Sequence, residues 1–228
     1  SNAVVVEVTV SDLQRQSVVI KGQSWDRVEV PGWVHWYEPG APAVPTRGTV
    51  LGVPFGAQVR VTVIDADYEE IADVDLMPVA DTQWLGSEDY PLSRAVYEKD
   101  VPLYSRDAFY PGDEAVILNQ GVMRDQQVAV LSLRPVQYNP VRRVLRVARR
   151  LRVRVQFVQG ANRQVIRPSL KNSGGGFEAL YEKGLLNAKQ ARAWRGQPAR
   201  PVYKQALEWY NPLAEYYKIG IVEDGLYR

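Results

Sequence analysis

The chain has 228 residues, of which 46% are hydrophobic, so it can form one large domain with a sizeable core. It contains no cysteine and one histidine, which excludes a Cys/His catalytic dyad and a disulfide framework. The net charge of +2 is unevenly spread, because residues 65–100 hold eleven acidic residues and residues 126–177 hold none. We interpret this as two oppositely charged faces or neighbouring loops of one domain. A nucleic-acid surface is disfavoured because the arginines alternate with core residues.

The first half of the chain reads as a series of short strands. Ser1-Asn2-Ala3 is typical of a remnant of an expression tag, and we leave it out of the fold prediction. Runs rich in β-branched residues predict strands at residues 4–10, 17–21, 27–30, 49–53, 58–64, 73–77 and 115–118.

Two irregular regions interrupt these strands. Prolines and glycines flank residues 31–42 and predict a loop. Its aromatic residues could form a sugar-binding platform or pack against the end of the fold. Residues 78–112 have weak periodicity and several prolines, and so long a loop in a compact domain is usually functional or disordered.

The best-specified stretch is residues 128–158. Its large apolar residues between Leu145 and Phe157 occupy odd positions, with arginines on even ones, as in a strand with one buried face. Ala148 and Arg149 break the pattern and predict a bulge. The segment 135–140 begins and ends with proline, which favours a turn. We therefore expect a long two-stranded antiparallel unit with an arginine-rich outer face.

The character of the chain changes after Phe157. Apolar residues recur at helical spacing over residues 177–188, Gly184 weakens or splits that helix, and residues 192–201 suggest an exposed linker. We expect a β-sandwich domain at 4–172, a helical segment with a linker at 173–202, and the start of a following domain at 203–228. The fold class is all-β, an antiparallel β-sandwich of the jelly-roll or Greek-key kind with a short C-terminal helical segment.

The sequence offers little chemistry of its own. A serine triad would have to use His35, which sits in a loop without a recognisable serine elbow. The carboxylates between Asp65 and Glu70 could chelate calcium, but their spacing fits no EF-hand and favours a solvated acidic loop. No glycine-rich phosphate loop and no membrane-spanning stretch is present. We predict a non-catalytic domain without a cofactor or metal.

Four motifs in sequence order resemble the N-terminal prodomain of the gingipain family of secreted cysteine peptidases. Their sequences are GAPAVP at 40–45, FYPGD at 109–113, PVQYNP at 135–140, and KNS at 171–173 leading into GFEALY at 176–181. The resemblance as a whole covers roughly residues 17 to 195 of the chain. The resemblance implies a β-sandwich that acts as an intramolecular chaperone and as an inhibitor of the catalytic domain of the same polypeptide. It also implies export to the periplasm and the cell surface, often by the type IX route.

The resemblance also suggests site residues. An arginine on an extended loop within 78–112 would enter the specificity pocket of an arginine-specific peptidase, and Arg94 is the first candidate with Arg106 the second. Either arginine could instead simply pair with nearby acids. Arg195 and Arg200 are the candidates for the processing site that releases the prodomain. The competing hypothesis is a stand-alone adhesin or carbohydrate-binding module, which would use Trp33, Trp36 and Tyr37.

Overall fold

The computed structural model of the chain describes residues 2–85, 93–159 and 176–195. The strands are β1 (Ala3–Thr9), β2 (Gln14–Ile20), β3 (Gln23–Glu29), β4 (Val34–His35), β5 (Pro45–Val53), β6 (Ala57–Ile71), β7 (Asp81–Trp84), β8 (Ser93–Val96), β9 (Ala115–Met123), β10 (Gln126–Leu133), β11 (Val136–Asn139) and β12 (Val144–Gln159). The helices are α1 (Val101–Tyr104), α2 (Gly176–Gly184), α3 (Ala188–Ala191) and the 3₁₀ turn η1 (Arg192–Trp194).

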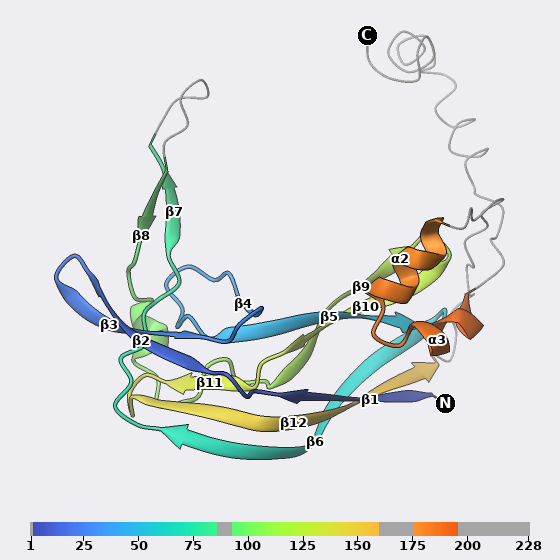
Figure 1. The fold of residues 1–228 in the computed structure, drawn as a ribbon, viewed down its shortest axis with the longest axis horizontal. Coiled ribbons are helices and arrows are strands. Elements are labelled where there is room, and N and C mark those ends of the chain that lie inside the picture. Colours follow the sequence, from blue (N-terminus) through green and yellow to red (C-terminus); the bar gives the residue numbers. More distant parts are fainter. Residues whose placement is uncertain (1, 86–92, 160–175, 196–228) are drawn as a thin grey trace, which may run out of the picture.

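Two antiparallel sheets form the body of the molecule (Figure 1). In the first sheet, β12 pairs with β1 and β11 along one edge and with β6 along the other. The second sheet has the order β4-β5-β10-β9. Apolar side chains from both sheets, such as Leu51 of β5, Leu131 of β10 and Leu151 of β12, meet in one core cluster. The predicted antiparallel β-sandwich is therefore confirmed.

The pairing that we expected around residues 128–158 was wrong. β12 has the predicted alternation, because Leu145, Val153 and Phe157 are all buried. However, β10 pairs with β5 and β9 in the second sheet and not with β12. The segment expected to be a turn contains β11, which pairs with β12. Alternation identifies the buried face of a strand, but it does not identify the neighbouring strand.

The arginines of β12 face carboxylates on the adjacent strand. The predicted bulge is present, since the register against β6 shifts between Ala148 and Arg150. The guanidinium of Arg150 lies 2.8 Å from Asp65 and 3.1 Å from Asp67. These acidic residues belong to β6, so the expected acidic loop is in fact strand. Opposite charges across neighbouring strands compensate for the weak β propensity of aspartate and glutamate.

Two other expectations need correction. Residues 73–77 do not form a strand, although Leu76 makes an isolated parallel bridge with Asp26. The irregular span 78–112 contains β7, β8 and the single-turn helix α1, whereas helix was expected only near the end of the chain. Asp100 caps α1 by accepting a hydrogen bond from the backbone N–H of Leu103 at 2.9 Å. A helix this short carries no periodic signal.

The C-terminal helices lie on the sandwich. α2 ends at Gly184, where the sequence predicted a weakening or a split. Tyr181, Leu185 and Ala191 are buried in a cluster that includes side chains from β5, β9 and β10. Asn187 also donates to the carbonyl of Gly52 at 2.9 Å and accepts from its N–H at 2.7 Å. The helical segment is thus fixed to the second sheet by apolar packing and by backbone recognition.

Candidate functional site

The β7–β8 hairpin stands away from the sandwich, at the end opposite to α2 and α3 (Figure 1). Its two strands pair from Asp81 opposite Val96 to Trp84 opposite Ser93. Residues 81–83 and 93–95 of the two strands are exposed, whereas Val96 is buried at the foot of the hairpin. A two-stranded hairpin is marginally stable alone in water, so the position of this one depends on its attachment to the body.

The residues that flank the hairpin, Val79 before β7 and Asp100 after β8, are its two feet, and both attach to the loop at Gly40 and Ala41. The N–H of Gly40 donates to the carbonyl of Val79 at 3.0 Å, and the N–H of Val79 donates to Ala41 at 2.7 Å. On the other foot, the N–H of Asp100 donates to the carbonyl of Gly40 at 2.9 Å. Gly40 has a φ of +83°, and a Cβ there would lie 3.1 Å from the nitrogen of Asp100. A glycine is therefore required for this close approach.

A lysine and two aromatic rings reinforce the same region. The ammonium of Lys99 lies 4.5 Å from the ring centre of Trp25 and 4.8 Å from that of Tyr104. It also forms an ion pair with Asp75 at 3.3 Å. The hydroxyl of Tyr104 donates to the carbonyl of Leu76 at 3.0 Å, and burial raises the pKa of this tyrosine, which stays neutral. The hairpin therefore rises from a base that several independent contacts fix.

The two inhibitory candidates occupy different elements. Arg94 lies exposed on β8, directly opposite Gln83, to which its guanidinium donates at 3.1 Å. Arg106 lies exposed two residues after α1, near the base and not on the hairpin. Among the described residues, neither arginine forms an ion pair. The projecting hairpin thus presents Arg94 with its charge uncompensated by any described carboxylate.

The two processing candidates also differ. Arg195 follows η1, and only 12% of its side chain is exposed, because it contacts Glu178 and the ring of Tyr181. Arg200 lies outside the described residues, as does the proposed following domain at 203–228.

The aromatic residues of the competing hypothesis do not form one exposed platform. Trp33 packs against both main core clusters. Trp36 and Tyr37 are exposed, and Trp36 lies against the guanidinium of Arg134 at 5.5 Å. The Nε2–H of His35 donates a hydrogen bond to the backbone carbonyl of Val28 at 3.0 Å, and no serine of the described residues hydrogen-bonds to this ring.

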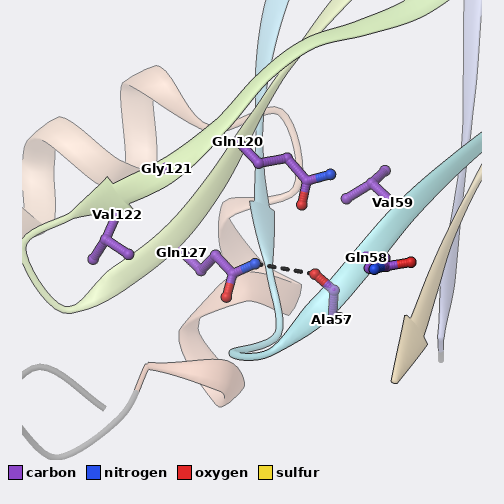
Figure 2. Close-up of a pocket in the computed structure, with 7 residues that line it drawn as sticks. All are labelled: Ala57, Gln58, Val59, Gln120, Gly121, Val122 and Gln127. Atoms are coloured by element: carbon purple, nitrogen blue, oxygen red, sulfur yellow. Dashed lines mark hydrogen bonds between the residues drawn. The ribbon is translucent and has the colours of Figure 1, made fainter. Parts of the chain in front are cut away.

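A hollow of about 520 Å³ lies between the start of β6 and the β9–β10 hairpin (Figure 2). Gln127 crosses it, donating to the carbonyl of Ala57 at 3.1 Å and accepting from the N–H of Gly56 at 2.9 Å. Its lining consists of glutamines, aliphatic side chains and Gly121. None of the described residues that line this hollow is an acid, a base or a nucleophile, so these side chains offer it no catalytic chemistry.

Within residues 2–85, 93–159 and 176–195, no group of acidic, histidine or cysteine side chains could hold a metal ion. No helix in these ranges is long and apolar enough to cross a membrane.

Most of the contacts that fix the base of the hairpin could not be predicted from the sequence. Gly40 belonged to a motif that supported the resemblance, but nothing in the pattern showed that it joins both feet of the hairpin. Lys99 and Tyr104 lay in the span described only as irregular. Their partners, Trp25 and Leu76, are distant in sequence, so the sequence held no signal for these contacts.

Comparison with known proteins agrees with the motifs. Gingipain R2 of Porphyromonas gingivalis is 27% identical over 160 residues, which is 68% of this chain and 20% of that protein. Lys-gingipain of the same species is 27% identical over 158 residues, which is 67% of this chain and 9% of that protein. The chain therefore spans a fifth or less of the length of these curated relatives.

Two solved structures share the fold. The complex of the Porphyromonas gingivalis RgpB pro- and mature domains matches with a TM-score of 0.66 and 24% identity, covering 82% of this chain and 93% of that chain. A structure concerning the zymogenic latency of gingipain K from Porphyromonas gingivalis matches with a TM-score of 0.53 and 24% identity, covering 68% and 86%.

The profile of the Propeptide_C25 family matches residues 1–183. This match confirms both the resemblance that the motifs suggested and the prediction of a non-catalytic prodomain. Because the matched region covers well over half of the chain, the chain belongs to the Propeptide_C25 family.

Proposed function

We propose that this chain is the N-terminal prodomain of a secreted gingipain-like cysteine peptidase. It assists the folding of the catalytic domain of the same polypeptide, keeps that domain latent, and is then removed by proteolysis. The observation that carries the proposal is the projecting β7–β8 hairpin on a fixed base, in a chain of a propeptide family. Passage through the periplasm to the cell surface by the type IX route follows from the same resemblance.

The arrangement suits an inhibitor that inserts one segment into a cleft. A rigid support lowers the entropy lost when an extended segment binds, so affinity does not depend on a large interface. The contacts of Gly40 with both feet and of Lys99 with Trp25 supply that support.

We assign Arg94 as the residue that enters the specificity pocket. Its guanidinium has only the neutral amide of Gln83 as a hydrogen-bonding partner among the described side chains. A carboxylate at the bottom of a pocket would bind it by two parallel hydrogen bonds, which an arginine provides and a lysine does not. Arg106 remains the second candidate, on the base instead of the hairpin.

The test measures inhibition of the separately produced catalytic domain of the same polypeptide by this chain. Arg94→Ala should raise the inhibition constant by at least about 100-fold, because one partner of a buried charge pair is lost. Arg106→Ala serves as the matched control and should leave the constant within about twofold, as expected for an exposed side chain outside the contact.

An unchanged constant for Arg94→Ala, with a large rise for Arg106→Ala, would transfer the role to the second candidate. An unchanged constant for both variants would refute insertion of either arginine. No inhibition by the unaltered chain would refute the latency function itself.

A further inference from the structure

The two processing candidates differ in the residue that follows them. Arg200 precedes Pro201, whereas Arg195 precedes Gly196. The peptide nitrogen of proline bears no hydrogen and is part of a rigid ring, so a peptidase meets a hindered bond after Arg200. Glycine adds no side chain beside the bond after Arg195. On chemical grounds, the bond that follows Arg195 is therefore the better substrate.

The structure nevertheless holds the side chain of Arg195. Its guanidinium forms an ion pair with the carboxylate of Glu178 and lies 4.2 Å from the ring centre of Tyr181. Arg192 also approaches the same carboxylate, at 3.6 Å. We call Glu178 and Tyr181 the arginine clamp. An arginine-specific peptidase needs this guanidinium in its own pocket, and one side chain cannot occupy both sites.

The clamp is attached to the sandwich. The hydroxyl of Tyr181 lies 2.9 Å from the carbonyl oxygen of Met123 and 2.6 Å from the carboxylate of Asp125, both at the β9–β10 turn. Burial, together with the hydrogen bond to Asp125, raises the pKa of Tyr181 to about 12, so its hydroxyl keeps its proton.

The residue before Arg195 is docked as well. The ring of Trp194 meets Phe157 of β12 edge to face, with the ring centres 5.1 Å apart. A peptidase cleft binds its substrate as an extended strand. Trp194 and Arg195 must therefore both leave the sandwich before the chain can enter such a cleft.

We infer that Arg195 is the processing residue and that the arginine clamp withholds it until the helical segment undocks. In the cleavage, water adds across the Arg195–Gly196 peptide bond, which leaves a carboxylate on Arg195 and an amino group on Gly196. The helical segment then departs with the prodomain. The biological role of this gate rests on the proposed prodomain function, but the protection of the bond does not.

Limited digestion with trypsin, which cuts after arginine and lysine, tests the gate directly. The measured quantity is the initial rate at which mass spectrometry detects peptides ending at Arg195. Glu178→Gln removes the charge of the clamp but keeps its shape. Cleavage of the briefly opened state follows the opening equilibrium, so this variant should be cut after Arg195 about tenfold faster than the unaltered chain.

The matched control is Glu182→Gln on the same helix. Glu182 is exposed, and the substitution changes the net charge by the same amount. It should leave the rate unchanged, and an unchanged thermal midpoint in both variants would show that the fold is intact.

Equal rates for all three proteins would overturn the clamp. A mature peptidase that begins at a residue other than Gly196 would overturn the assignment of Arg195. Neither result depends on inhibition, which the Arg94→Ala experiment measures separately.

Discussion

Arg94 and Arg195 have the same side chain, but the fold presents them in opposite ways. Arg94 is exposed on a hairpin that projects from the body, with Gln83 as its partner. Arg195 is 12% exposed and lies in a clamp of opposite charge at the other end of the molecule. A peptidase that recognises arginine would therefore reach Arg94 more readily than Arg195. Under the proposed function, presentation, more than residue type, distinguishes the arginine that binds from the arginine that is cut.

The two regions are also supported differently. The hairpin projects, but its feet are joined through the backbone of Gly40. The helical segment lies flat on the sandwich, and side chains such as Tyr181 and Asn187 attach it. A glycine-to-alanine substitution can weaken either the attachment of the hairpin or that of the helical segment. Inhibition and protection of the bond after Arg195 can therefore be tested separately.

The largest effect is expected at Gly52. A Cβ added there would lie 2.3 Å from the Cβ of Ala191, a distance that forces the helical segment to move. Gly52→Ala should lower the free energy of unfolding by about 2–3 kcal/mol, as overpacking commonly does. It should also expose Arg195 to trypsin while leaving inhibition by Arg94 nearly unchanged. Thermal unfolding and digestion rates measure the two results.

Gly48→Ala is the control for this substitution, because it lies on the same strand and a Cβ there would have no heavy atom within 4 Å. It should change neither the stability nor the digestion rate appreciably. If Gly52→Ala left the digestion rate after Arg195 at the level of the control, the helical segment would not protect that bond.

A smaller effect, on the other region, is expected at Gly40. Alanine at a φ of +83° is strained by about 1–2 kcal/mol, and its Cβ would crowd the nitrogen of Asp100. Gly40→Ala should therefore loosen both feet of the hairpin and weaken inhibition about tenfold. Gly32→Ala has a similar φ of +76° but no neighbouring atom within 4 Å. The control should lose similar stability without losing inhibition; equal losses of inhibition would show that the feet do not position Arg94.

The sequence predicted the body of the fold better than the two ends to which we assign functions. The strict alternation from Leu145 to Phe157 reflects burial on one face of a strand, and burial is a local pattern that a sequence displays. The expected partner of that strand was wrong. β12 instead pairs with β6 and β1, which are far from it in the chain. Choosing between distant strands depends on the energy of the whole core, which no short window contains.

For the candidate site, the resemblance named a span of the chain but gave no information about its geometry. Arg94 was selected by resemblance, and its exposure opposite Gln83 became visible only in the folded chain. Arg195 was expected in an exposed linker, because prolines and charges surround it. Its burial depends on Glu178 and Tyr181, whose ring is in turn fixed by the β9–β10 turn. Contacts among three segments that are distant in the chain produce no periodic pattern in a sequence.

The smallest effect concerns the pH dependence of the support beneath the hairpin. Asp26 on β3 accepts hydrogen bonds from Arg15 at 2.7 Å and from the N–H of Asp75 at 2.7 Å, just before the chain reaches β7. Partial burial pushes the pKa of Asp26 upward, but these hydrogen bonds outweigh it and hold the pKa below its ordinary value. The folded state therefore favours the charged carboxylate.

The sign of the pH effect follows from this shift. The contribution of Asp26 is complete above its unfolded-state pKa of about 3.9 and is lost as the pH falls through the lower pKa of the folded state. Asp26→Asn should cost about 1 kcal/mol at neutral pH and should flatten the loss of stability below about pH 4, as urea unfolding at several pH values would measure. Asp12→Asn, at an exposed residue whose carboxylate accepts from Ser11, should leave that slope unchanged. If both variants kept the slope of the unaltered chain, Asp26 would not couple the hairpin base to pH, and the contacts of Gly40, Lys99 and Tyr104 would account for the rigidity of the base.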